Sequence, residues 1–203
     1  MSLTAYHALI TKPAKDAPLV FAFHGTGGDE RQFAGLVHDL LPEAGLIAPR
    51  GDLSEHGANR YFRRTGEGVY DMADLARRSA RMAGFIAAHR EANPGAAVYA
   101  LGYSNGANIL AAVSFLQPQL FDRIALLHPL IPWTPDDQPG LAGCEVLITG
   151  GRRDPICPLP LTEALSGYYR RQQAKVTLTL QDGGHEIRQD ELIALAKLLQ
   201  RRD

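Results

Sequence analysis

The stretch Gly102-Tyr103-Ser104-Asn105-Gly106 follows an apolar run, residues 97–101, and precedes a helix-like run that starts near residue 107. A glycine on each side of a serine at this spacing indicates a sharp turn from a strand into a helix, because side chains with a Cβ would crowd the turn. Such a turn lifts the serine hydroxyl above the edge of a sheet. It also places the hydroxyl near the helix N-terminus, whose N–H groups stabilise negative charge. The stretch therefore predicts a nucleophile, Ser104.

The rest of the chain alternates short apolar runs with longer amphipathic ones, as parallel strands joined by crossover helices do. We expect strands at residues 6–10, 19–24, 45–49, 97–102, 124–128, 145–150 and 176–181. Helices are expected at residues 29–41, with Asp29 as N-cap, at 71–92, with Asp71 as N-cap, and at 105–116, 160–173 and 189–202. The pattern predicts a single α/β domain, residues 1–203, with a mostly parallel sheet covered by helices on both faces.

Composition excludes several classes of function. The net charge of −1 gives no reason to expect binding to nucleic acid or an anionic membrane. No apolar run approaches the roughly 20 residues of a membrane span. The N-terminus shows no signal-peptide pattern, so we expect a cytoplasmic protein. Cys144 and Cys157 are the two cysteines, which form neither a disulfide framework nor a metal-type spacing.

A serine hydroxyl needs a base to accept its proton and an acid to orient that base. Where the serine lies at a strand-to-helix turn of such an α/β sheet, the three groups follow along the chain in the order serine, acid, histidine. His185 directly follows the last expected strand, in Gln181-Asp182-Gly183-Gly184-His185, and is the expected base. Asp154 follows the preceding strand and is the expected acid. Asp182 is a rival, but it lies on the same loop as His185 and is poorly placed to orient the ring.

The developing oxyanion requires two backbone N–H donors. One is expected from Asn105, the residue after the nucleophile. The other is expected from Thr26, in the glycine-rich stretch His24-Gly25-Thr26-Gly27-Gly28 that follows the second strand. His24 itself is expected to brace this loop rather than to act as a second base. The stretch lacks the lysine and the spacing of a phosphate-binding loop.

These residues together resemble the phospholipase/carboxylesterase branch of the α/β-hydrolases, the relatives of acyl-protein thioesterases. Within that branch the chain resembles the small bacterial carboxylesterases linked to quinone-stress operons. The matching motifs occur in the family's order: His24-Gly25-Thr26-Gly27-Gly28-Asp29-Glu30, Pro49-Arg50-Gly51, Arg60-Tyr61-Phe62-Arg63-Arg64, Gly102-Tyr103-Ser104-Asn105-Gly106-Ala107-Asn108, Leu127-His128-Pro129, Asp154-Pro155-Ile156-Cys157 and Gly184-His185.

The resemblance implies a serine esterase that uses no cofactor, has a small or absent lid and is often a homodimer. It carries Ser104, Asp154 and His185 over as the catalytic triad and places residues 60–64 beside the active site. One departure is visible, because the family often has two consecutive histidines where this chain has Leu127-His128.

The substrate pocket is the least determined part of the site. The two long irregular stretches, residues 50–69 and 129–143, start at the carboxyl ends of strands and are its expected walls. Arg60 and Arg64 either clamp an anionic group of the substrate or pair with Asp71 or Asp74 to anchor the loop. Phe62, His128 and Trp133 are expected to line the pocket. Cys157 is interpreted as an inert buried thiol.

The combined hypothesis is a serine carboxylesterase that hydrolyses small to medium carboxylic esters through an acyl-enzyme. One alternative is thioester or lysophospholipid hydrolysis by the same triad. Another is a non-catalytic binding protein built on a hydrolase fold, since a fold does not fix a function.

Overall fold

The computed structural model of the 203-residue chain describes residues 2–66 and 68–201. Its centre is a seven-stranded sheet in the order β1-β3-β2-β8-β9-β10-β11. The strands are β1 (Ala8–Thr11), β2 (Leu19–Phe23), β3 (Gly45–Pro49), β8 (Val98–Tyr103), β9 (Arg123–Leu127), β10 (Glu145–Gly151) and β11 (Lys175–Gln181). All neighbours are parallel except β1 and β3. The expected mostly parallel sheet is confirmed, with most strand ends shifted by one or two residues.

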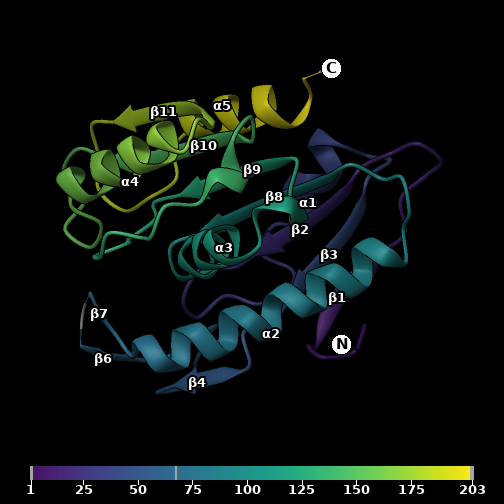
Figure 1. Ribbon diagram of the computed structural model, residues 1–203, viewed down its shortest axis with the longest axis horizontal. Coiled ribbons are helices and arrows are strands. Elements are labelled where there is room, and N and C mark those ends of the chain that lie inside the picture. The colour runs from purple at the N-terminus through teal and green to yellow at the C-terminus, as the bar shows by residue number, and fades with distance from the viewer. Residues whose placement is uncertain (1, 67, 202–203) are drawn as a thin grey trace.

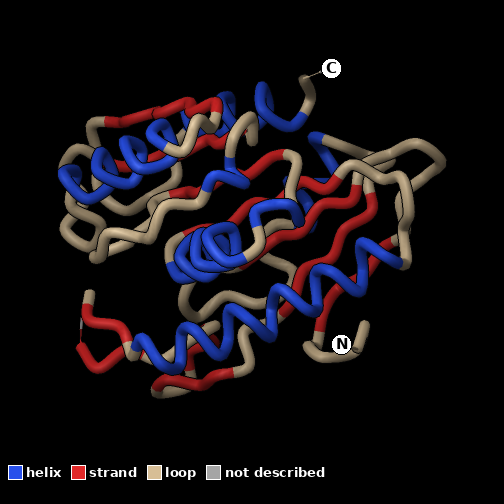
Figure 2. Tube along the Cα trace, in the orientation of Figure 1, coloured by secondary structure: helices blue, strands red, loops and turns tan. Residues whose placement is uncertain are grey.

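Helices cover both faces of this sheet (Figures 1 and 2). On one face, α2 (Met72–Glu91), α3 (Asn105–Leu116) and α4 (Leu159–Arg171) pack on alternate strand residues such as Phe21, Ala100 and Ile148. On the other face, α1 (Ala34–Leu40) and α5 (Gln189–Leu199) pack on the intervening residues, such as Val20 and Leu147. The central strands are therefore apolar throughout, because side chains of alternate residues point into two separate cores.

The two predicted helix caps differ in outcome. Asp71 caps α2 as expected, since its carboxylate accepts a hydrogen bond from the Asp74 N–H at 3.0 Å. Asp29 does not cap α1, which begins only at Ala34. The Asp29 carboxylate instead accepts from the Arg31 N–H at 2.9 Å, so that local turn replaces the first turn of the expected helix.

Residues 50–69 are less irregular than expected. They form two small antiparallel pairs, β4 (Leu53–Glu55) with β5 (Ala58–Arg60) and β6 (Arg64–Gly66) with β7 (Val69–Tyr70). Both lie near the N-terminal end of α2 (Figure 1). Residues 129–143 remain irregular apart from a short 3₁₀ turn, η2 (Pro139–Leu141), and another 3₁₀ turn, η1 (Pro118–Leu120), follows α3. None of the helices in residues 2–66 and 68–201 has the length and apolarity to cross a membrane.

The strand order determines where the site residues meet. Strand β8, which leads into Ser104, lies between β2 and β9. The register pairs Phe23 with Gly102 and Leu127 with Tyr103, so His24 and His128 follow on either side of the serine. In an open α/β sheet this carboxyl edge is where ligands bind.

Candidate active site

Ser104 occupies a strained turn between β8 and α3. Its backbone has φ 53° and ψ −118°, a conformation that side chains with a Cβ rarely adopt. The flanking glycines are required sterically. A Cβ on Gly106 would lie 2.4 Å from the carbonyl oxygens of Phe23 and His24, and one on Gly102 would lie 2.6 Å from the Gly106 carbonyl oxygen. The glycine spacing in the sequence thus reflects close backbone packing around the serine.

The structure brings Ser104, His185 and Asp154 into one hydrogen-bonded series. The Nε2 atom of His185 lies 2.9 Å from the Ser104 hydroxyl oxygen, and its Nδ1 atom lies 2.8 Å from Oδ2 of Asp154. Tyr103 holds His185 in place, since its hydroxyl donates to the His185 carbonyl at 2.6 Å and its ring tilts against the imidazole. The rival acid Asp182 is exposed and pairs with Arg152 instead.

Asp154 is held as a carboxylate. Burial by itself raises the pKa of its carboxyl, but hydrogen bonds from the Cys157 N–H, His128, His185 and the Ile156 N–H outweigh burial and lower the pKa below its usual value. The acid is therefore ionised at neutral pH, as a partner that orients His185 must be.

The two expected oxyanion donors lie at the same opening as the serine. Thr26 and Asn105 line the cavity together with Ser104. Within residues 2–66 and 68–201, neither of their backbone N–H groups donates to another part of the chain. Arg60 fixes the Thr26 side chain, because its guanidinium donates to the Thr26 hydroxyl at 2.8 Å. The Asn105 side chain accepts from the Tyr61 N–H at 2.8 Å, which ties the helix start to the segment after β5.

His24 braces the glycine-rich loop of residues 24–28 by hydrogen bonds at both nitrogens of its ring. Its Nδ1 atom lies 2.6 Å from the Gly25 carbonyl oxygen, and its Nε2 atom accepts from the Gly51 N–H at 2.9 Å. The ring packs on Tyr61, whose hydroxyl accepts from the His24 N–H and donates to the Pro49 carbonyl. Burial lowers the pKa of His24, since desolvation exceeds the effect of its hydrogen bond to Gly25. His24 is a neutral structural histidine.

The cavity over Ser104 has a volume of about 360 Å³. Its wall comes mainly from residues 60–70 and from the ends of β8 and α3, and residues 129–143 contribute Leu130 to it. The lining residues are Thr26, Arg60, Arg64, Gly68, Tyr70, Tyr103, Ser104, Asn105, Asn108, Leu130, Ile156, Cys157 and His185.

Three residues expected in the pocket lie elsewhere. Phe62 is fully buried in the core and packs edge-on against Tyr70. Trp133 also contacts Tyr70, but it lines a separate hollow against α4. His128 is fully buried beneath Asp154. The expectation failed because it assumed that aromatic residues near the site face the opening, whereas the core on the α2–α3 side takes up the large apolar rings.

The structure corrects the predicted ion pairs of the arginines. Glu55, in β4, binds both Arg60 and Arg64, with closest N–O distances of 3.4 and 3.0 Å. Asp74 instead accepts from the Arg63 N–H and pairs with Arg77 and Arg78. The two guanidinium groups therefore both anchor the small hairpins and face the cavity.

Residues His128, Asp154 and His185 also place ligand atoms within 4.8 Å of one another, a grouping that a metal ion could use. Both Nδ1 atoms already contact the same Asp154 oxygen, however, and Nε2 of His185 contacts the Ser104 hydroxyl. A hydrogen-bonded network accounts for this arrangement. The Cys157 thiol nearby is buried and contacts the His128 carbonyl, and burial raises its pKa well above the usual value. Burial and a raised pKa are what the interpretation of Cys157 as an inert thiol expects, although the residue also lines the cavity.

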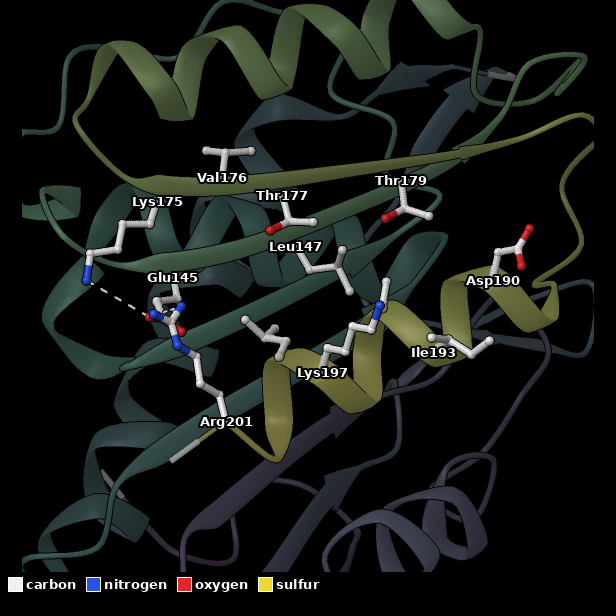
Figure 3. A pocket seen from close by; sticks show the side chains of 12 residues that line it. Glu145, Leu147, Lys175, Val176, Thr177, Thr179, Asp190, Ile193, Lys197 and Arg201 are labelled. Carbon is white, nitrogen blue, oxygen red and sulfur yellow. Dashed lines mark ion pairs between the residues drawn. The ribbon is translucent and has the colours of Figure 1, made fainter. Parts of the chain in front are cut away.

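A larger hollow, here called the outer hollow, lies between α5 and the β10–β11 edge and has a volume of about 690 Å³ (Figure 3). Its lining is Glu145, Leu147, Lys175, Val176, Thr177, Thr179, Asp190, Ile193, Ala194, Lys197, Leu198 and Arg201. This described lining contains no serine, cysteine or histidine, and Glu145 pairs there with Lys175 and Arg201. The larger of these two hollows is therefore not the one that contains Ser104.

Two residues of the site were not found by sequence reasoning. Tyr103 stood out only as the variable position of the glycine–serine motif. Glu191 was not singled out, because a glutamate in the first turn of a helix is a common end residue. It does take such a role, accepting from the Arg188 N–H at 2.7 Å, but it also reaches His128. The contact of Glu191 with His128 becomes visible only in the folded structure, where α5 packs against β9 and β10.

Comparison with known proteins supports this assignment of the fold. No family model matches the chain. MhqD of Bacillus subtilis, whose name designates it as a hydrolase, is 38% identical over 176 residues, which cover 85% of this chain and 88% of MhqD.

Solved structures show the same similarity. The protein Atu2452 of unknown function from Agrobacterium tumefaciens is 49% identical, with a TM-score of 0.92 and 98% of each chain covered. A carboxylesterase from Bacillus cereus is 29% identical, with a TM-score of 0.89, covering 97% of this chain and 94% of that one. With these relatives and the geometry at Ser104, the chain belongs to the phospholipase/carboxylesterase family of α/β-hydrolases and is a hydrolase.

Proposed function

We propose that the protein is a serine carboxylesterase in which Ser104, His185 and Asp154 form the catalytic triad. The observation that carries the proposal is the series of contacts from the serine hydroxyl through both nitrogens of His185 to Asp154, at 2.9 and 2.8 Å. These contacts match what acyl transfer needs, namely a base within reach of the nucleophile and an ionised acid behind it.

The reaction follows from the positions of these atoms. Ser104 attacks the ester carbonyl while Nε2 of His185 accepts the hydroxyl proton, and the Thr26 and Asn105 N–H groups stabilise the oxyanion. His185 then protonates the leaving alcohol. Water, activated by the same imidazole, attacks the acyl-enzyme, which releases the acid and restores Ser104. Asp154 remains a carboxylate throughout.

The size and lining of the cavity support small to medium esters. A volume of about 360 Å³ is at the lower end for pockets that hold drug-sized ligands. The guanidinium groups of Arg60 and Arg64 in its wall disfavour a long apolar acyl chain, because burying a charge against hydrocarbon is costly. This favours a carboxylesterase over the rival lysophospholipase on the same triad.

The test is a panel of p-nitrophenyl esters with acyl chains of increasing length, run on the wild type and on Ser104→Ala. The variant should lose on the order of 10⁶-fold in kcat, as enzymes do when a serine nucleophile is removed. Ser54→Ala, which changes an exposed serine of β4, is the matched control and should keep wild-type activity.

Three results would reject parts of the proposal. Wild-type hydrolysis by Ser104→Ala would exclude this serine as the nucleophile. Activity that continues to rise with acyl length would favour the lysophospholipase or long-chain thioesterase instead. A fluorophosphonate probe that fails to label Ser104 in the wild type would favour a non-catalytic binding protein.

A further inference from the structure

Asp154 has a second imidazole partner, the fully buried His128. We propose that His128, held as an imidazolium between Asp154 and Glu191, is a positioning residue that fixes the Asp154 carboxylate for His185. This inference rests on the proposed triad. It adds two residues to the series, so that the order becomes Glu191, His128, Asp154, His185, Ser104.

Four contacts from the described residues hold the Asp154 carboxylate. Its Oδ1 atom accepts from the N–H groups of Ile156 and Cys157, at 2.8 and 2.9 Å. Its Oδ2 atom lies 2.8 Å from Nδ1 of His185 and 2.8 Å from Nδ1 of His128. Without His128, two donors would hold one carboxylate oxygen and a single imidazole would hold the other. With it, the oxygen that contacts His185 is held by two imidazole nitrogens.

The contacts of its two ring nitrogens indicate the charge of His128. Its Nε2 atom lies 2.8 Å from Oε1 of Glu191, a close ion-pair contact that is bent from ideal hydrogen-bond alignment. Both ring nitrogens therefore face carboxylate oxygens. Carboxylates only accept hydrogen bonds, so a neutral ring would direct a lone pair at one of them. The doubly protonated ring is the form whose charge is compatible with a carboxylate at each nitrogen, through a hydrogen bond to Asp154 and an ion pair with Glu191.

The titration of these groups agrees with that geometry. Burial by itself lowers the pKa of His128, but the contacts with Glu191 and Asp154 outweigh burial and raise it. Burial raises the pKa of Glu191, and the contact with His128 outweighs it and lowers that pKa. One cation between two carboxylates leaves a net charge of −1, and Oε2 of Glu191 is further stabilised by the Arg188 N–H.

The surroundings of His128 are otherwise uncharged or weakly ionisable. Its ring packs edge-on against the ring of Tyr103, from β8, with centroids 6.0 Å apart. The ring of His185, from the loop after β11, is 5.2 Å away. The Cys157 thiol contacts its carbonyl. Burial raises the pKa values of Tyr103 and Cys157, so both are neutral at physiological pH.

His128 and Glu191 are themselves held rigidly by the elements around them. His128 has φ 50° directly after β9, and its N–H donates to the Thr149 carbonyl of β10 at 3.1 Å. Glu191 lies in the first turn of α5 and is fully buried, whereas its neighbour Asp190 lines the outer hollow (Figure 3). Three elements therefore converge on one imidazole whose side chain has no exposed surface. A group held this way cannot exchange rotamers without breaking two charged contacts.

The primary experiment measures ring protonation by ¹⁵N NMR of the histidines in the resting wild type at pH 8. This pH is above the usual histidine pKa of about 6.5. His128 should carry a proton on both ring nitrogens. His24 is an internal control in the same spectrum, because its bonds to Gly25 and Gly51 require one protonated and one unprotonated nitrogen. In Glu191→Gln, which keeps the shape of the side chain but donates an N–H, His128 should become neutral.

The kinetic experiment measures kcat, KM and the pH profile of kcat/KM for His128→Gln and Glu191→Gln. His128→Gln should lower kcat on the order of 100-fold, the size of effect that misplacement by an ångström produces, with a much smaller change in KM. Losing the cation beside Asp154 should also move the acidic limb of the profile to higher pH, more in His128→Gln than in Glu191→Gln. A purely structural role would not move that limb. His89→Gln, a buried histidine of α2 that contacts the Leu3 carbonyl, is the matched control.

Failure of this inference can be told apart from failure of the proposed function. A neutral His128 at pH 8, or unchanged kcat and pH profile in both variants, would overturn the inference even if a fluorophosphonate labels Ser104. An unlabelled Ser104 would overturn the triad. The NMR measurement on the wild type depends neither on activity nor on whether a variant folds.

Discussion

Two buried histidines flank the strand that leads into Ser104, and their pKa values are shifted in opposite directions. His24 follows β2 and His128 follows β9, the strands on either side of β8. Their exposed fractions are 2% and 0%. His24 contacts backbone groups, one acceptor and one donor, and its pKa is lowered. His128 contacts two carboxylates, and its pKa is raised.

The comparison shows that burial does not by itself set the charge of a histidine. Desolvation is the largest influence on both rings and favours the neutral form in both. At His128 the two carboxylates reverse the outcome, because Coulomb attraction is strong in a site without water. The neutral ring supports the loop of the proposed oxyanion hole, and the charged ring supports the proposed acid.

The largest expected difference between the two histidines is in the free energy of unfolding after each imidazole is replaced. His128→Leu would leave Asp154 and Glu191 as uncompensated buried carboxylates and should lower the free energy of unfolding by about 3–5 kcal/mol. His24→Leu loses neutral hydrogen bonds and should cost about 1–3 kcal/mol. Urea unfolding of both variants measures the difference. Equal losses would show that the contact between His128 and Glu191 does not involve a charge.

A smaller difference in stability is expected between variants of two tyrosines, Tyr61 beside His24 and Tyr103 beside His185. Tyr61→Phe removes the partner of the His24 N–H and of the Pro49 carbonyl, both buried, and should lower stability by about 1–3 kcal/mol. Tyr103→Phe removes a single bond to the His185 carbonyl and should cost about 0.5–1.5 kcal/mol. We expect a fall in kcat from Tyr103→Phe, since it supports the base. Thermal unfolding and ester hydrolysis, measured together, check both expectations. A loss of stability from Tyr103→Phe as large as that from Tyr61→Phe would contradict them.

The smallest effect is the pH dependence of stability, and its sign differs between the two rings. The ordinary pKa is 6.5 for each. Because the folded pKa of His128 is raised, its contribution is complete below pH 6.5 and is lost as the pH rises through the folded value. Because the folded pKa of His24 is lowered, its contribution is complete above pH 6.5 and is lost as the pH falls through the folded value.

Unfolding curves at several pH values would measure this opposition. The stability difference between wild type and His128→Gln should narrow as the pH rises above 6.5. The difference between wild type and His24→Gln should narrow as the pH falls below 6.5. If both stability differences narrowed as the pH changed in the same direction, the charges assigned to His24 and His128 would be contradicted.

Much of the fold could be predicted from local patterns. Apolar runs such as residues 45–49 became strands with the predicted bounds, and Asp71 capped its helix, because these features depend on neighbours in the chain. The start of α1 was wrong because Asp29 can bond to its own turn as well as to a helix end, and sequence does not choose between the two. The hairpins of residues 53–70 were missed because their strands are only two or three residues long.

The sequence alone determined the order of the chemical groups along the chain: a serine at a glycine-lined turn, then Asp154, then His185. It could do so because steric crowding at Ser104 leaves a local mark, the paired glycines. Only the tertiary structure decided that Phe62 lies in the core and Trp133 in a separate hollow against α4, and that Glu191 reaches His128. These outcomes depend on which segments, far apart in the chain, pack against one another. Contacts between residues as far apart as 128 and 191 leave no periodicity or motif in the sequence.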